Sequence, residues 1–147
     1  MMTETIPARF DETRPFLAVN IAVLTVSDTR TAETDKSGDA LAAMIEADGH
    51  RVASRMILKD DTDLITGQLN VGVSDPNIDC IITTGGTGVT GRDVTPEAFD
   101  RVLEKKIDGF GEMFRWLSFQ MIGTSALQSR AVGGVAHGTY MFALPGS

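Results

Sequence analysis

The feature that most constrains the fold of this chain is a nearly unbroken apolar run, Phe16–Val26 (FLAVNIAVLTV), which is rich in β-branched residues. A strand that is apolar on both faces belongs in the middle of a sheet that helices cover on both sides. Later segments alternate between short β-branched runs and stretches in which apolar residues recur at helical spacing. This alternation predicts an α/β protein with a mostly parallel sheet.

The strands are expected at Phe16–Val26, Arg51–Leu58, Cys80–Thr84, Ala131–His137 and Thr139–Leu144. Helices are expected at Ser37–Asp48, Thr62–Val73, Phe110–Ile122 and Ser125–Arg130. Asp61 is expected to cap the second of these. A further helix is expected to start at Thr95 as its N-cap, with Pro96 as its first residue. The last two strands are expected to form a hairpin, whose first strand runs antiparallel to the others. Residues 16–147 then form a single domain, and residues 1–15 a flexible N-terminal arm or an oligomer contact.

The charge balance limits the partners. Thirteen basic residues against twenty acidic ones give a net charge of −7, which argues against binding to a nucleic-acid backbone or an anionic membrane surface. The longest apolar stretch, Ile21–Val26, is far shorter than a membrane span of about 20 residues. The single cysteine, Cys80, cannot form an internal disulfide and is expected in the core, which fits a reducing compartment. We therefore expect a cytoplasmic protein without nucleic-acid or membrane partners.

The strand Cys80–Thr84 runs directly into a glycine-rich segment, residues 85–93 (GGTGVTGRD). Glycines let backbone N–H groups converge on an anion and let a ligand approach closely. The segment lacks the Lys-Ser/Thr pair of a Walker loop. Its glycines match a dinucleotide fingerprint, but no helix follows directly and the acid about 20 residues later, Glu112, falls inside a helical pattern. An anion-binding loop is therefore favoured over the alternative that the glycines only serve a tight turn.

Two acidic residues near this loop are candidates for chemistry. Asp93 could form an Asx turn or a helix cap, but Thr95 is expected to fill the cap position. A carboxylate beside a phosphate cradle is repulsive unless Mg²⁺ lies between them, so a metal or substrate ligand is favoured for Asp93. Asp60 follows the second strand and has no obvious structural role, unlike Asp61, which makes Asp60 the better catalytic candidate.

Other polar residues are expected at the same edge of the sheet. Ser27 and Asp28 end the first strand, and ligands of open α/β sheets bind outside the carboxyl ends of the strands. Anion binding by an acidic chain needs local cations, for which Arg92, Arg115 and Arg130 are the candidates. Each arginine has the alternative of being a solvated surface residue, and Arg92 is favoured because it flanks the loop.

Four segments in this order resemble the MoaB/MogA family of molybdenum cofactor biosynthesis proteins, which has related domains in gephyrin: IAVLTVSDTR, ITTGGTGVTGRDVTPEA, GFGEMFRWLSFQMIGTSALQSRAVGG and FALPGS. The resemblance runs from about Ile21 to Ser147, and the third segment is more similar to the MoaB branch than to MogA. It implies a three-layer α/β/α sandwich with a mixed, mostly parallel five-stranded sheet. It also implies a final helix beyond Ser147, which these 147 residues do not include.

The resemblance implies that the domain binds molybdopterin. Active family members adenylylate this pterin with Mg-ATP and release pyrophosphate, so the implied activity is that of a molybdopterin adenylyltransferase. A molybdopterin-binding or assembly protein without catalysis is the alternative, and Lys59 stands where active members often have Pro. The implied partners are molybdopterin, ATP, other cofactor-assembly enzymes and further copies of this chain, in a hexamer or a trimer, with the hexamer favoured.

By matching motifs, the resemblance implies that Asp93 holds Mg²⁺ and orients the reacting phosphates, and that Asp60 is the second catalytic acid. Together with the residues favoured above, the candidate substrate-binding set is Ser27, Asp28, Thr84, Gly85, Gly86, Thr87, Gly88, Arg92, Arg130, Gly146 and Ser147. The required cofactors are Mg²⁺ and, as co-substrate, ATP.

Overall fold

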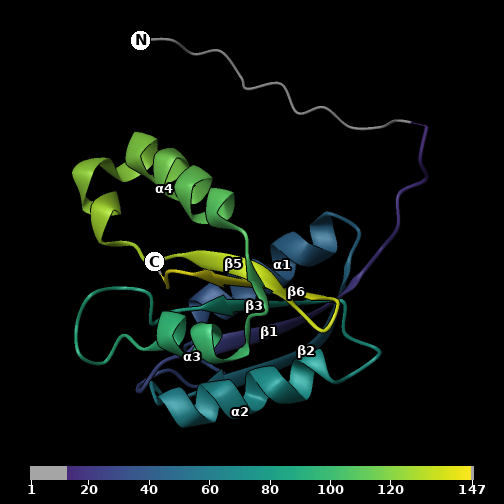
Figure 1. Ribbon diagram of the computed structural model, residues 1–147, viewed down its shortest axis with the longest axis horizontal. Helices are drawn as coiled ribbons and strands as arrows, with labels where there is room; N and C mark the ends of the chain where they lie inside the picture. Colours follow the sequence, from purple (N-terminus) through teal and green to yellow (C-terminus); the bar gives the residue numbers. More distant parts are fainter. Residues whose placement is uncertain (1–12, 147) are drawn as a thin grey trace.

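The computed structural model describes residues 13–146, so most of the expected N-terminal arm and Ser147 lie outside the described residues. The elements in chain order are β1 (Asn20–Val26), α1 (Lys36–Ala47), β2 (Arg51–Leu58), α2 (Thr62–Val73), β3 (Cys80–Thr84), α3 (Thr95–Val102), β4 (Lys105–Lys106), α4 (Asp108–Ile122), the 3₁₀ helix η1 (Gly123–Gln128), β5 (Val132–Ala136) and β6 (Thr139–Leu144). The strands form one sheet in the order β2-β1-β3-β6-β5-β4. Figure 1 shows α2 and α3 on one face of this sheet and α1 and α4 on the other.

The predicted α/β/α sandwich with a mixed, mostly parallel sheet is confirmed. β1 pairs in parallel with β2 and β3, and β3 pairs in parallel with β6, whereas β5 runs antiparallel to β6. Among the described residues the sheet has six strands rather than five, because the two-residue β4 pairs with β5 through Lys105↔Val135 and Lys106↔Gly134. Two exposed lysines carry no apolar pattern, so this edge strand could not be predicted from the sequence.

The apolar first strand is sandwiched between two cores, which is why both of its faces are apolar. Ala22, Leu24 and Val26 point into the core beneath α2 and α3. Ile21 and Val23 point into the core beneath α1. The strand is shorter than predicted and begins at Asn20, because β2 and β3 offer it partners only from Arg51 and Cys80 onward.

Local capping explains where the long helices begin, with one correction. The carboxylate of Asp61 accepts a hydrogen bond from Leu64 N at 3.0 Å and caps α2 as predicted. Asp35 caps α1 in the same way, accepting from Gly38 N at 3.0 Å. The prediction that Thr95 caps α3 is wrong, because Thr95 is the first helical residue and its hydroxyl instead donates to the carbonyl of Gly85 at 2.9 Å.

The hairpin between β5 and β6 closes through two residues with left-handed backbones. His137 has φ 50° and Gly138 has φ 79°, the combination of a two-residue type I′ turn that suits the strand twist. Within residues 13–146, no helix has the length and apolar character needed to cross a membrane.

The cap of α2 gives a direct test of this fold. Asp61→Ala leaves the Leu64 N–H without its acceptor, and we expect a loss of about 1 kcal/mol in the free energy of unfolding, measured by urea titration. Asp61→Asn keeps a capping oxygen and should stay within about 0.5 kcal/mol of the unsubstituted protein. Equal losses in the two variants would contradict the capping role.

Candidate functional site

The site is centred on the chain reversal that follows β3, where Gly85 and Gly86 both have positive φ angles, 102° and 73°. A Cβ on Gly85 would collide with the carbonyl oxygen of Val26 at the end of β1, and one on Gly86 would collide with the hydroxyl of Thr95. Gly85 N also donates to Leu144 O at 2.9 Å, which continues the pairing with β6. These two glycines are therefore required by packing and backbone conformation.

Packing constrains the rest of the loop unevenly. Thr87 is buried, whereas a Cβ on Gly91 would meet nothing within 4 Å. Gly88 lies against the carboxylate of Asp93, whose Oδ2 is 2.7 Å from the position of a Cβ on Gly88. Packing thus explains the glycines at the start of the segment but not Gly91, so the tight-turn alternative accounts for only part of the loop.

Asp93 closes the loop on itself. Its Oδ2 accepts hydrogen bonds from the backbone N–H of Thr90 at 2.9 Å and from the Thr90 hydroxyl at 2.8 Å. Partial burial opposes ionisation, but the hydrogen bonds from Thr90 and from the N–H of Gly88 outweigh it, so the pKa of Asp93 lies below its ordinary value. Asp93 is therefore ionised at neutral pH and has a structural role in the loop besides any ligand it binds.

A second group of charges joins three loops at the carboxyl edge. Arg92 donates to Asp28 Oδ2 from Nε at 2.9 Å and from Nη2 at 2.7 Å. Asp28 Oδ1 accepts from the backbone N–H of Asp60 at 3.1 Å. The hydrogen bonds from Arg92 and then from Asp60 N–H hold the pKa of Asp28 below its ordinary value. The expected convergence of the loops after β1, β2 and β3 is present.

Asp60 has the opposite electrostatic environment. Burial is the largest cause that raises its pKa, and the negative charges of Asp28 and Asp93 raise it further, against the opposing charge of Arg92. A carboxylate that is desolvated and surrounded by like charges is under electrostatic strain, as is common at functional sites.

The other two candidate cations are bound to backbone carbonyls. Arg115 donates from Nη1 to Ser129 O at 3.3 Å and to Ala131 O at 3.1 Å, which fastens α4 to the chain before β5. Arg130 donates from Nε to Gly88 O and from Nη2 to Asp93 O, both at 2.7 Å, and its Nη1 pairs with Glu97.

The end of β6 completes the edge. Pro145 O accepts from the Thr84 hydroxyl at 3.2 Å, and Gly146 O accepts from the Ser37 hydroxyl. Ser27, whose hydroxyl accepts from Thr29 N and Arg30 N at 3.1 Å each, lies at the same place. A small cleft of about 140 Å³ is lined by Thr25, Val26, Ser27, Arg30, Asp35, Ser37, Thr84, Gly85 and Gly146.

Four polar residues of this cleft were not predicted: Thr25, Arg30, Asp35 and Ser37. Arg30 and Asp35 precede the predicted helix Ser37–Asp48, and Asp35, two residues before Ser37, is a residue type found at helix starts that could have pointed to it. Asp35 is buried and also accepts from the hydroxyl of Thr25 at 2.8 Å and from Arg55 at 3.2 Å. The contact between Asp35 and Arg55 could not be predicted, because Arg55 is brought near by the parallel pairing of β1 with β2.

A larger apolar cavity adjoins the glycine loop. It has a volume of about 530 Å³, and its lining residues are Thr87, Gly88, Phe114, Leu117, Ser118, Met121, Ile122, Ser125, Ala126, Gln128, Ser129 and Pro145. This volume lies within the usual range for small-molecule sites. Because one wall is the loop and another is α4 with η1, a ligand could place an anionic group on the loop and an apolar ring system in the cavity.

The carboxylates are suited to Mg²⁺ that arrives with phosphate. In the described part of the chain, no three or more metal-ligating side chains form a group that could hold a metal ion. Mg²⁺ normally keeps several waters and binds through one or two carboxylates together with substrate phosphates, rather than in an all-protein cage. Asp60 and Asp93 beside the loop fit that mode of binding.

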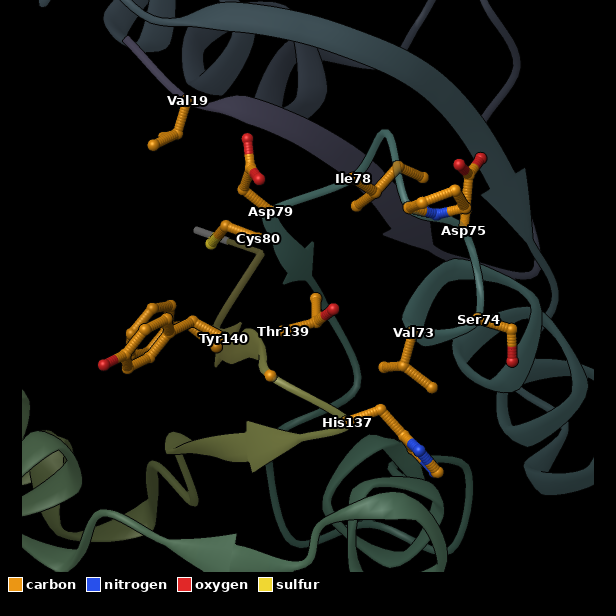
Figure 2. A pocket seen from close by; sticks show the side chains of 13 residues that line it. Val19, Val73, Ser74, Asp75, Ile78, Asp79, Cys80, His137, Thr139 and Tyr140 are labelled. Atoms are coloured by element: carbon orange, nitrogen blue, oxygen red, sulfur yellow. The ribbon is translucent and has the colours of Figure 1, made fainter. Parts of the chain in front are cut away.

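Another hollow, of about 680 Å³, lies away from this site. Figure 2 shows it among Val19, Cys80, Thr139 and Tyr140, near the amino ends of β3 and β6. Ligands of parallel sheets bind at the carboxyl ends instead. Cys80 is a core residue as predicted, and burial raises the pKa of its thiol to about 12, so the thiol is not a reactive nucleophile.

Comparison with known proteins agrees with this geometry. Residues 22–147 match the family described as "Probable molybdopterin binding domain". Molybdenum cofactor biosynthesis protein B of Bacillus cereus is 46% identical over 130 residues, which cover 88% of this chain and 77% of that protein. The protein of the same name from Escherichia coli K12 is 44% identical over 132 residues, which cover 90% and 78%.

Solved structures give the same result. A crystal structure of molybdenum cofactor biosynthesis protein B has a TM-score of 0.87 at 44% identity and covers 91% of this chain and 84% of that one. The tungsten cofactor synthesizing protein MoaB from Pyrococcus furiosus has a TM-score of 0.78 at 30% identity, with 88% and 83% covered. Both structures share the α/β sandwich of this chain. The chain belongs to the MoaB/MogA family of molybdenum cofactor biosynthesis proteins.

The strained carboxylate predicts a stability effect with a defined pH dependence. Since the folded-state pKa of Asp60 is raised, the folded protein loses stability as pH rises through the window between the ordinary and the raised pKa. Asp60→Asn should therefore increase the urea midpoint at pH 7, and the gain should vanish near pH 3, where both states protonate the carboxyl group.

Asp28→Asn provides the control of opposite sign. Its lowered pKa stabilises the fold above the ordinary value, so the substitution should reduce the urea midpoint at pH 7, and the loss should shrink as pH falls through the folded-state pKa. A destabilised Asp60→Asn protein at pH 7 would show that Asp60 is not under electrostatic strain.

Proposed function

We propose that this protein acts in molybdenum cofactor biosynthesis by binding molybdopterin and transferring the adenylyl group of ATP to its terminal phosphate, with release of pyrophosphate. The observation that most supports the proposal is the juxtaposition of the glycine loop with an apolar cavity of about 530 Å³. The loop suits the phosphate of molybdopterin, and the cavity suits its flat ring system. The names of the relatives, which concern molybdenum and tungsten cofactor synthesis, agree with this substrate.

The proposed reaction requires little proton transfer. An oxygen of the molybdopterin phosphate attacks the α-phosphorus of ATP, the new P–O bond forms, and the bond to the bridging oxygen of the β-phosphate breaks, so that pyrophosphate leaves with its electron pair. The nucleophile is already an anion, so catalysis comes from positioning and charge neutralisation. The backbone N–H groups of Gly86 and Thr87 and the guanidinium of Arg92 are the groups of this chain that would do so, since the N–H of Gly85 donates to Leu144 and that of Gly88 to Asp93.

Asp60 and Asp93 would hold Mg²⁺, which supplies neutralisation of the phosphate charges when bound. The strain at Asp60 supports this role, because a divalent cation would relieve the like-charge repulsion from Asp28 and Asp93. Asp93 would need only one of its oxygens for the metal, since Oδ2 is the one engaged by Thr90.

A binding or assembly role without catalysis is the second candidate function. The observation in its favour is that Arg92 is paired with Asp28 and Asp93 with Thr90, so the two groups most needed for catalysis already have partners. A binding protein could keep both contacts, whereas in a catalyst Arg92 would have to leave Asp28 and contact the phosphate.

An assay with purified protein, molybdopterin and Mg-ATP distinguishes the two. We expect adenylylated pterin and pyrophosphate as products. Asp93→Asn should lower turnover at least about 100-fold, because a weakened Mg²⁺ site would no longer neutralise the phosphate charges, while molybdopterin affinity should stay within about threefold. Asparagine is the informative substitution because its side-chain oxygen still accepts from Thr90, so the loop keeps its shape.

The matched control is Asp63→Asn, at an exposed carboxylate that pairs with Arg101 on the surface of α2. Its turnover should equal that of the unsubstituted protein. Pterin binding without any product would exclude the transferase reaction and leave the binding role. Equal loss of binding and turnover in Asp93→Asn would indicate that Asp93 only maintains the loop.

The protein is also proposed to act as a homo-oligomer. In α4, Gly111 is the only buried residue of 15. The exposed large apolar side chains on α4 and η1 that do not line the apolar cavity are Met113, Trp116, Phe119 and Leu127. Figure 1 shows α4 and the segment after it projecting from the sandwich. Exposed apolar side chains in this number are typical of a protein–protein interface, and copies of this chain, in a hexamer or a trimer, are the partners we propose.

Light scattering after gel filtration tests the oligomer. We expect a mass near six or three times the 15.7 kDa of the chain. Phe119→Glu, which would bury an unpaired charge in the interface, should shift the protein towards the monomer mass. Val71→Glu, at a similarly exposed apolar residue on α2, should leave the mass unchanged. A monomeric unsubstituted protein would refute the proposal.

A further inference from the structure

Arg130 holds both ends of the glycine loop from a distant part of the chain. It lies between η1 and β5, and its backbone N–H donates to Thr87 O at 2.8 Å. Its side chain donates to Gly88 O and to Asp93 O at 2.7 Å each, while Nη1 pairs with Glu97 of α3. Each of the three guanidinium nitrogens therefore donates to an oxygen of the protein.

These contacts also fix the direction of the loop's N–H groups. In a trans peptide the N–H of one residue points opposite to the carbonyl of the residue before it. Arg130 holds the carbonyls of Thr87 and Gly88, so the N–H groups of Gly88 and Val89 point away from Arg130. The Gly88 N–H accordingly reaches the carboxylate of Asp93, whose pKa it helps to lower.

We propose that Arg130 is a positioning residue, which holds the backbone of the glycine loop in the conformation that receives the anion instead of binding the anion itself. The phosphate part of this inference rests on the proposed function. The contacts of Arg130 also join the loop to the chain that follows η1, which lines the apolar cavity. One side chain therefore fixes the two halves of the proposed substrate site relative to each other. A lysine has the same charge but a single nitrogen, and it cannot reproduce this set of bonds.

The variants Arg130→Lys and Arg130→Ala separate the charge of Arg130 from the geometry of its hydrogen bonds. Arg101→Lys, at a surface arginine of α3, is the matched control. The first measurement is amide hydrogen exchange of residues 86–94 by mass spectrometry in the absence of ligand. We expect exchange to rise at least about tenfold in both Arg130 variants, while β1 and α2 exchange as in the unsubstituted protein. Arg101→Lys should change neither region.

The second measurement is the dissociation constant of pyrophosphate with Mg²⁺. Arg130→Lys, although it keeps the charge, should weaken binding about tenfold, nearly as much as Arg130→Ala, because the loop backbone is no longer held in place. Millimolar guanidinium should partly restore affinity in Arg130→Ala. Arg92→Ala, at the exposed loop arginine, should weaken binding without faster exchange in residues 86–94.

The outcomes are distinguishable. Full affinity and unchanged exchange in Arg130→Lys would overturn the inference, since charge alone would then suffice. A rise in exchange across β1 and α2 as well would overturn it in favour of a general stabilising role. If the unsubstituted protein bound no pyrophosphate, the proposed function would fail, and the exchange measurement would still decide whether Arg130 orders the loop.

Discussion

The close approach of Gly85 to the carbonyl oxygen of Val26 is the contact on which the rest of the site depends. β3 runs between β1 and β6, so the chain that leaves it has to turn directly over the end of β1. A positive φ without a Cβ is the conformation that achieves this. The turn then presents the Gly85 carbonyl to the hydroxyl of Thr95, which fixes the start of α3. One glycine thus sets the positions of the loop, α3 and the sheet edge.

Much of the fold was predictable because its signals are local. β2, α2, β3 and β6 have the bounds that the sequence predicts, since each combines a clear apolar pattern with a stop or start residue beside it, such as Asp61 before α2. The antiparallel direction of β5 followed from the two-residue turn at His137-Gly138. The convergence of the loops after β1, β2 and β3 followed from parallel pairing alone.

What the sequence could not show were contacts between distant residues. Arg92 and Asp28 are 64 positions apart, and Arg130 and Gly88 are 42 apart, so neither pairing leaves a local pattern. The same reason explains Thr95, whose residue type suits a cap but whose hydroxyl is taken by Gly85. The exposed face of α4 was also ambiguous, because an apolar helix reads alike whether its partner is the core or another chain.

The net charge of −7 bears directly on how an anion could bind at this edge. Asp28, Asp60 and Asp93 repel phosphate, while Arg92 and Arg130 are already bonded to protein oxygens. A phosphate that engages Arg92 must therefore replace a carboxylate, and the displaced Asp28 would add to the repulsion at Asp60. An anion alone gains little from that exchange, whereas an anion that arrives with a divalent cation gives the carboxylates a new partner. The charge arrangement thus favours a magnesium-bound phosphate over a free one, although the protein as a whole is acidic.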